Sequence, residues 1–196
     1  MWHLERRAEA VAHVSRAQAG FEEMLGAGHP NVLKCFHNIG MLSAAAGHLR
    51  EAERVYELAL AARVQALGEA HADSLKTMCN LGLTRHQLGD HERAAEALGT
   101  AARLAKRGLG PSHPITLASE HNRALAVSAR GAHDEAAAAL RAVLEARRRA
   151  LGVSHRDTLQ CAVDLSSVLS ATGKAAHVTE ARALLVSALD ETVSAL

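Results

Sequence analysis

The sequence predicts an all-α solenoid, a stack of antiparallel helix pairs, and three observations lead to this fold class. A five-residue pattern, Leu-Gly-x-x-His, occurs four times, and each copy begins 42 residues after the last. A second glycine recurs at the same interval between the copies. Residues with high helix propensity, above all Ala, Leu, Glu and Arg, fill the segments on both sides. A fixed period in this range is typical of repeat arrays.

The repeated pattern is expected to end one helix and to begin the next. Its copies occupy residues 25–29, 67–71, 109–113 and 151–155. Glycine directly after a periodic run is a common C-cap, and the prolines that follow His29 and His113 suit a first helical turn. Each histidine of the pattern is expected to cap the next helix or to pack under it. The first helix of each repeat is predicted at 30–46, 72–88, 114–130 and 156–172.

Each first helix is predicted to stop at a glycine, where a left-handed backbone lets the chain reverse. These glycines are Gly47, Gly89, Gly131 and Gly173. A second helix then follows, with a small residue and a larger apolar residue four positions later, a spacing that lets two helices approach and interlock. The pairs are Ala52 and Tyr56, Ala94 and Leu98, and Ala136 and Leu140.

The chain is predicted to be a single repeat array over residues 1–196. It begins with the second helix of a partial repeat, at residues 1–24, and continues with repeats at 25–66, 67–108, 109–150 and 151–196. In the last repeat the Glu180-Ala181 pair comes three residues late, so we expect a longer turn over residues 174–179. An array that starts and stops in mid-repeat leaves apolar faces uncovered, which favours self-association or a neighbouring section.

Composition excludes several classes of protein. The 22 basic and 21 acidic side chains nearly balance, so no bulk field attracts nucleic acid or an anionic membrane. The three cysteines are far apart and form no C-x-x-C pair, which favours a reducing, cytoplasmic setting over a disulfide framework. No run approaches the roughly eighteen apolar residues of a membrane span. The basic run at 147–149 is expected to be a solvated helix end.

Catalytic and metal-binding functions are not expected either. No nucleophile with a base and an orienting acid stands out, and the glycines are turn and cap residues rather than a phosphate-binding loop. The four junction histidines lie one period apart, so stacked hairpins on the order of 10 Å apart prevent them from sharing one ion. No cofactor is expected.

These residues resemble the tetratricopeptide repeat, in its 42-residue kinesin-light-chain type. The resemblance is carried by the junctions, the turn glycines, the Glu-Ala pairs of the second helices, and the sequences Asn-Ile-Gly at 38–40 and Asn-Leu-Gly at 80–82. It implies a right-handed superhelix whose first helices line a concave groove for an extended or helical peptide. The chain departs from the family pattern at Arg123, where Ile39 and Leu81 are apolar. Either the helix rotates there, or the arginine reaches into the groove.

The strongest candidates for peptide binding are asparagines one period apart in the first helices. They are Asn38, Asn80 and Asn122, with Asp164 at the same place in the fourth repeat. An amide donates and accepts at once, so such a ladder can pair with a peptide backbone of any sequence. The resemblance supports this role, because asparagines in similar grooves hold a peptide backbone or a terminal carboxylate. The alternative is that each amide ties its own helix to the next repeat.

Other side chains are expected to line the same groove, which would be mildly basic with an apolar floor. They are Lys34, His37, Met41, Lys76, Leu83, His86, His121 and Arg123. A ligand with acidic residues beside a few hydrophobic anchors fits this description. The sequence therefore predicts a non-enzymatic module that binds a peptide segment of a partner protein. The alternative is a structural or regulatory section of a larger signalling or motor-adaptor assembly, acting through its end and convex faces.

Overall fold

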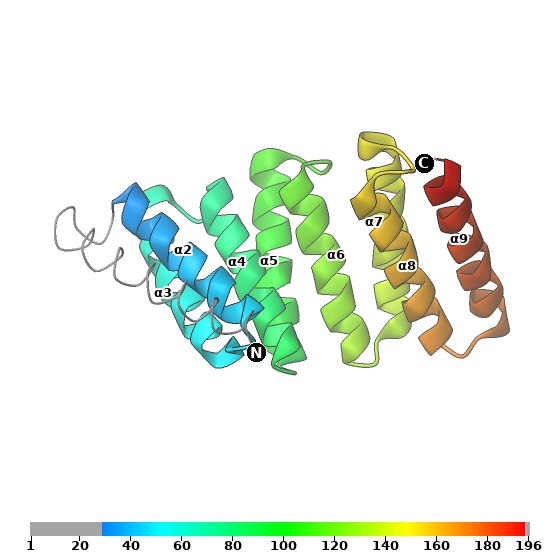
Figure 1. Ribbon diagram of the computed structural model, residues 1–196, viewed down its shortest axis with the longest axis horizontal. Coiled ribbons are helices and arrows are strands. Elements are labelled where there is room, and N and C mark those ends of the chain that lie inside the picture. Colours follow the sequence, from blue (N-terminus) through cyan, green and yellow to red (C-terminus); the bar gives the residue numbers. More distant parts are fainter. Residues whose placement is uncertain (1–28, 195–196) are drawn as a thin grey trace. The chain divides into compact units, whose positions relative to one another are not determined.

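The computed structural model describes residues 29–194 of the chain, and the regular structure within this range is entirely α-helical (Figure 1). The helices are α2 (Pro30–Ala45), α3 (Leu49–Leu67), α4 (Ala72–Gln87), α5 (His91–Leu109), α6 (Pro114–Ala129), α7 (His133–Leu151), α8 (Arg156–Ala171) and α9 (Ala175–Ser194). The predicted all-α fold class is confirmed. The helix predicted before residue 25 lies outside the described residues.

The first helices begin where the sequence predicts and end one residue earlier than expected. Their N-caps are the four junction histidines, as predicted. His29 Nδ1 accepts a hydrogen bond from the backbone N–H of Asn31 at 3.2 Å, and His71, His113 and His155 each accept one from the residue two positions on. A side-chain acceptor at this place satisfies one of the N–H groups that an α-helix leaves without a partner at its start.

The predicted turn glycines adopt the left-handed backbone that they were expected to supply. Gly47 has φ +85° and Gly131 has φ +87°. A side chain is strained at such angles, whereas glycine adopts them without a steric penalty. The chain therefore reverses within a few residues and lays α3 against α2 and α7 against α6.

The longer turn expected over residues 174–179 is wrong. Helix α9 begins at Ala175, two residues after Gly173, just as α7 begins two residues after Gly131. The three additional residues therefore lie inside the helix. Because three residues make nearly one helical turn, their insertion into α9 brings a small side chain back to the helix face that it occupies in the other second helices. Ala181 is accordingly buried, with 2% of its surface exposed.

The chain divides into two compact units, and the division falls inside α5, between Ala97 and Leu98. In unit 1, residues 1–97, α3 packs against α2 and α4. In unit 2, residues 98–196, α7 packs against α6 and α8, and α9 packs against α8. The repeat boundaries and the single array over the whole chain stay predictions.

The small and large residues predicted to interlock are all buried. Ala52, Ala94 and Ala136 have no exposed surface, and Leu98 and Leu140 are likewise fully covered. In unit 1, Ala52, Tyr56 and Leu81 form the centre of a core cluster, with Ala44 and Leu60 packed at its edge. These contacts hold the first helices in fixed positions, which determines which of their side chains remain at the surface.

Candidate peptide-binding face

The two first helices of unit 1 carry the same three residue types at the same spacing. A lysine, an asparagine and a large apolar residue stand at positions i, i+4 and i+7, which lie along one face of a helix. The residues are Lys34, Asn38 and Met41 on α2, and Lys76, Asn80 and Leu83 on α4. The two helices contact each other and occupy equivalent places in successive repeats. We call this surface the α2/α4 face (Figure 1).

Most of these side chains are accessible to a ligand. Lys34, Asn38 and Lys76 are exposed, and Met41 leaves 46% of its surface open although it is a large apolar residue. The Lys76 ammonium lies 3.6 Å from the Asp73 carboxylate, in an exposed pair of the kind that contributes little to stability. Leu83 and Asn80 are half-buried. The face therefore offers positive charge, amide groups and apolar surface together.

Asn80 also has a contact inside unit 1. Its side chain forms a hydrogen bond with the hydroxyl of Tyr56 on α3. Burial raises the pKa of Tyr56 to about 12, and the hydrogen bond to Asn80 acts in the opposite direction. An amide carries both a donor and an acceptor group, so one contact does not use its full capacity. This contact joins α4 to the preceding helix, whereas the alternative raised from the sequence was a tie to the next repeat.

The structure brings together two predicted binding residues of unit 2. His121 Nε2 lies 3.0 Å from Asp164 Oδ2, and Asp164 Oδ1 accepts a hydrogen bond from Gln160 at 3.1 Å. His121 has only 5% of its surface exposed. The His121 side chain of α6 is thus joined to α8 through Asp164. Asn122, the next residue, is half-buried.

A buried arginine, which the sequence did not point to, joins the helices of unit 1. Arg63 on α3 is 3% exposed and donates to the backbone oxygen of Asp73 at 2.9 Å and to the hydroxyl of Thr77 at 2.5 Å, both on α4. The same guanidinium reaches the backbone oxygen of Leu33 at 3.4 Å and lies 3.3 Å from His37 Nδ1, both on α2. One side chain of the second helix thereby positions both first helices.

Unit 2 repeats this arrangement two periods later. Arg147 on α7 is 7% exposed, donates to the backbone oxygen of Asp157 at 2.7 Å, and lies 3.4 Å from His121 Nδ1. The interpretation of residues 147–149 as a solvated helix end is therefore wrong for Arg147. Both Arg63 and Arg147 pair with a first-helix histidine, whereas the matching position between them is Ala105. A comparison of the sequence at twice its period would have found this pair.

His37 is one of the predicted groove residues, and the structure gives its ring contacts inside unit 1. The ring packs edge-on against Tyr56, with centroids 5.9 Å apart. Burial, and then the neighbouring Arg63, lower the pKa of His37 to about 4. The imidazole is therefore neutral near pH 7, and one of its nitrogens is able to accept a hydrogen bond.

His86, another predicted groove residue, lies at the end of α4 beside the first residue of α5. Its Nδ1 atom is 3.1 Å from Nδ1 of His91, and the two ring centroids are 4.8 Å apart. Burial lowers the pKa of His86, and the positive charge that His91 can carry lowers it further. Both causes disfavour a positive charge on His86.

The structure gives Arg123 contacts with two second helices. Its side chain lies against Gly99 of α5, and its guanidinium donates to Glu135 of α7 at 2.8 Å. The matching residues Ile39 and Leu81 are 4% and 3% exposed, and Leu81 packs with Ala52 and Tyr56 of α3. Like Leu81, Arg123 thus lies against a second helix.

The described residues show neither a metal-binding cluster nor a membrane-spanning helix. No three His, Cys, Asp or Glu side chains in residues 29–194 come close enough to hold a metal ion together. None of the described helices combines the length and the apolar character that crossing a membrane requires.

The fold and this repeated surface define a helical-repeat protein of the scaffold type. The tetratricopeptide repeat model matches residues 1–63, 51–107 and 73–149, so the chain belongs to the tetratricopeptide repeat family. No curated protein sequence matches the chain.

Solved structures agree with this family and with the kinesin-light-chain type of repeat. Two crystal structures of nearly identical TPR-like repeats of a Podosopora anserina kinesin light chain protein, one of them a point variant, match with TM-scores of 0.83 and 0.80. Each is 25% identical, over 97% of this chain and 89% of the other. BtubC (BKLC) from P. vanneervenii matches with a TM-score of 0.77, over 97% of this chain and 77% of its own, and at 19% identity this likeness concerns the fold.

Proposed function

We propose that this protein is a non-catalytic interaction module that binds a peptide segment of a partner protein on the α2/α4 face. The observation that carries the proposal is the lysine, asparagine and apolar set, which occurs on two contacting helices at identical spacing. Family membership supports the general role, since tetratricopeptide repeats bind proteins. A cytoplasmic location is part of the proposal, because three thiols without a disulfide suit a reducing compartment.

Each residue type on the face has a distinct part in the proposed recognition. The amides of Asn38 and Asn80 would pair with backbone groups of the peptide, which makes that contact independent of its sequence. Lys34 and Lys76 would favour acidic residues of the ligand, and the exposed Met41 would receive an apolar anchor. The ligand is therefore an acidic peptide with hydrophobic residues between its charges.

Replacing Asn38 by alanine is expected to weaken peptide binding about fivefold, because one net hydrogen bond contributes about 1 kcal/mol. A peptide selected from a random display library on the parent chain would serve as the probe. Its dissociation constant, expected on the order of micromolar, would be measured by calorimetry. Asn80→Ala is expected to have the same or a larger effect, since that residue is half-buried.

Gln65→Ala provides the matched control, because Gln65 is an exposed amide on α3, outside the proposed face. It should leave the affinity unchanged. Circular dichroism would verify that each variant keeps its helices. Unchanged binding by a variant that lacks Asn38, Asn80 and Asn122 together would rule out the asparagine ladder.

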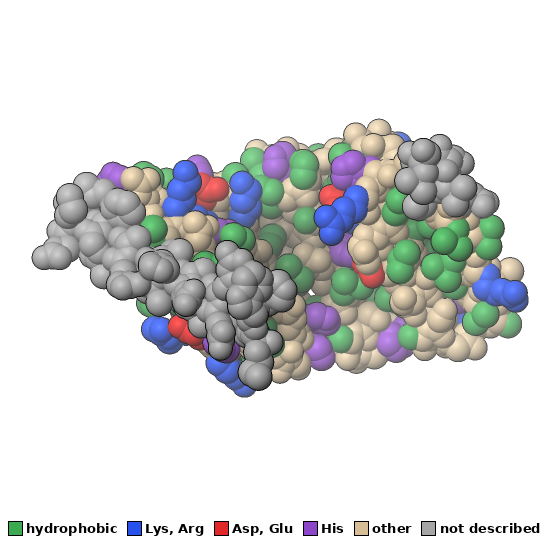
Figure 2. Space-filling view, viewed as in Figure 1, with side chains coloured by type: hydrophobic (Ala, Val, Ile, Leu, Met, Phe, Trp, Pro, Cys, Tyr) green, Lys and Arg blue, Asp and Glu red, His purple; other side chains and the backbone are tan. Residues whose placement is uncertain are grey.

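A second candidate function is association of two copies through α9. Figure 2 shows hydrophobic side chains gathered over this helix. Leu185, Val186 and Leu189 are 41%, 58% and 65% exposed, and exposed apolar groups in such a cluster often mark an interface. The parent chain is expected to self-associate at tens of micromolar in sedimentation experiments, whereas a Leu185→Lys, Leu189→Lys variant stays monomeric. A monomeric parent at that concentration would exclude this candidate.

A further inference from the structure

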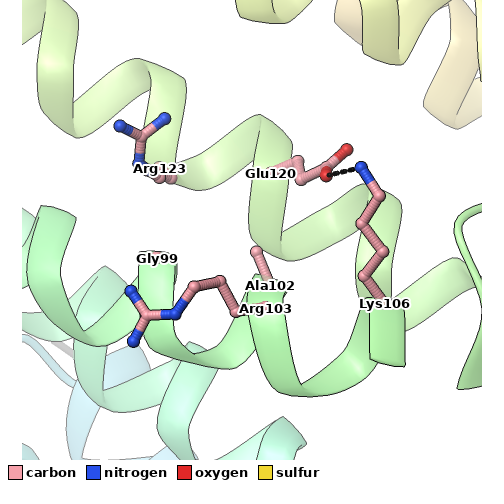
Figure 3. Close-up of a pocket in the computed structure, with 6 residues that line it drawn as sticks. All are labelled: Gly99, Ala102, Arg103, Lys106, Glu120 and Arg123. Atoms are coloured by element: carbon pink, nitrogen blue, oxygen red, sulfur yellow. Dashed lines mark ion pairs between the residues drawn. The ribbon is translucent and has the colours of Figure 1, made fainter. Parts of the chain in front are cut away.

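A surface pocket of about 310 Å³ lies in unit 2, between the C-terminal half of α5 and helix α6 (Figure 3). Its walls are formed by six residues, Gly99, Ala102, Arg103, Lys106, Glu120 and Arg123. The first four belong to α5 and the last two to α6. The pocket is separate from the α2/α4 face and does not depend on the function proposed for that face.

At the two α6 positions of this pocket, Glu120 and Arg123, the matching residues of the neighbouring repeats are apolar. One period earlier, Met78 and Leu81 of α4 take the places of Glu120 and Arg123, and they are 9% and 3% exposed. One period later, the same places hold Ala162 and Leu165, which are 5% and 1% exposed. The chain therefore departs from its own repeat at this pocket, where charged groups replace packed apolar ones. Such local departures from a repeated pattern often mark functional sites.

Gly99 lies beneath the stem of the Arg123 side chain. A Cβ atom at this position would lie 3.4 Å from Cδ of Arg123, so the arginine stem rests directly on the α5 backbone. In Figure 3 the guanidinium of Arg123 lies on the same side of the pocket as that of Arg103. A long cationic side chain thus lies against α5 in a place that an apolar residue fills in the neighbouring repeats.

The pocket has an excess of positive charge, with three cationic side chains and one carboxylate. Lys106 Nζ lies 3.6 Å from Glu120 Oε1, and Arg123 is paired with Glu135 at 2.8 Å, between side chains that are 39% and 57% exposed. Exposed ion pairs of this kind are weak, so a ligand anion that binds more strongly can replace the carboxylate partner. Arg103 donates to the hydroxyl of Thr100 at 3.2 Å and forms no ion pair with a described residue. Its guanidinium is therefore the group best placed to receive an anion.

We infer that this pocket binds an anionic side chain of a partner protein, either a phosphorylated residue or a glutamate or aspartate. Guanidinium groups present N–H donors in a fixed fork, which matches the oxygens of phosphate and carboxylate groups. Arg103 and Arg123 supply two such forks from adjacent helices, and Lys106 adds a third positive charge. The protein would then contact a partner at a second point, outside the peptide face.

The inference is tested by NMR titration of the full chain with three short peptides of the sequence Gly-Gly-Xaa-Gly-Gly, acetylated at the N-terminus and amidated at the C-terminus to remove the terminal charges, in which Xaa is phosphoserine, glutamate or serine. The phosphoserine and glutamate peptides distinguish the two sources of the anion. At least one of them should shift the amide signals of Gly99, Arg103 and Arg123, with a dissociation constant on the order of 1 mM. The uncharged serine peptide should leave these signals in place.

The decisive variant is Arg103→Gln, which should weaken binding of the charged peptide about tenfold, as expected for one lost charge-assisted hydrogen bond. Arg107→Gln is the matched control, because Arg107 is exposed on the same helix and does not line the pocket. Equal affinity of the two variants, or shifts spread over basic residues elsewhere on the chain, would overturn the inference. Circular dichroism and the unchanged signals of other residues would show that both variants are folded.

Discussion

Replacing Arg63 by alanine is expected to lower the free energy of unfolding by about 3 kcal/mol. The side chain is 3% exposed and donates to groups on both neighbouring first helices. Its removal leaves the Thr77 hydroxyl and two backbone oxygens without this donor, but the Asp73 oxygen still accepts from the Thr77 hydroxyl at 2.9 Å, so the expected loss from these groups is about 1–3 kcal/mol in all. It also removes the packing of the arginine stem. Urea unfolding, monitored by circular dichroism, would measure the change.

Arg54→Ala is the control for this experiment, since Arg54 is exposed on the same helix. Its effect should stay within about 0.5 kcal/mol, the usual range for surface substitutions. Arg63→Met tests the origin of the loss, because methionine keeps much of the packing but makes no hydrogen bond. It should fall between the other two variants. Equal stability of Arg63→Ala and Arg54→Ala would show that the buried arginine does not join the helices.

Replacing Gly40 by alanine is expected to destabilise the protein by about 1–2 kcal/mol. A Cβ atom at this position would lie 2.6 Å from Cε1 of Tyr56, which is closer than packed carbon atoms tolerate. Tyr56 is 2% exposed and its hydroxyl is hydrogen-bonded to Asn80, so the ring has little freedom to move away. Overpacking of this kind costs about 1–3 kcal/mol. The better helix propensity of alanine offsets up to about 1 kcal/mol of that loss.

The matching positions of the third repeat suggest a second substitution that would relieve this clash. There an alanine, Ala124, is fully buried in the same hairpin as Leu140. Gly40→Ala should therefore be neutral or stabilising in a Tyr56→Leu background, which a double-mutant cycle would measure. Gly99→Ala serves as a control, because its Cβ would meet only Arg123, at 3.4 Å, and it should not destabilise the chain. A loss of stability at Gly40 that persists without the tyrosine ring would contradict the steric explanation.

Local features of the fold could be predicted from the sequence because they depend on neighbouring residues. A histidine cap reaches an N–H group two positions away, and a glycine turn needs only its own backbone angles. The error at α9 had a different cause. Three additional residues complete nearly a helical turn, so the helix absorbs them, whereas a count of residues alone assigns them to a loop.

The candidate site was predictable only in part. The repeated spacing placed Lys34, Asn38 and Met41 on one helix face, and the structure leaves these side chains exposed. The inward contacts of His37 and His121 depend on arginines 26 residues away on another helix, which no local pattern reports. For a single side chain, periodicity gives the direction from the helix axis but not the partner that it meets.

The most direct test of the proposed function is to map a library-selected peptide onto the chain by NMR chemical-shift perturbation. We predict that the largest changes occur at the residues of the α2/α4 face, Lys34, Asn38, Met41, Lys76, Asn80 and Leu83. Saturable binding with changes confined to α9 or to the second helices, and with α2 and α4 unaffected, would contradict this account.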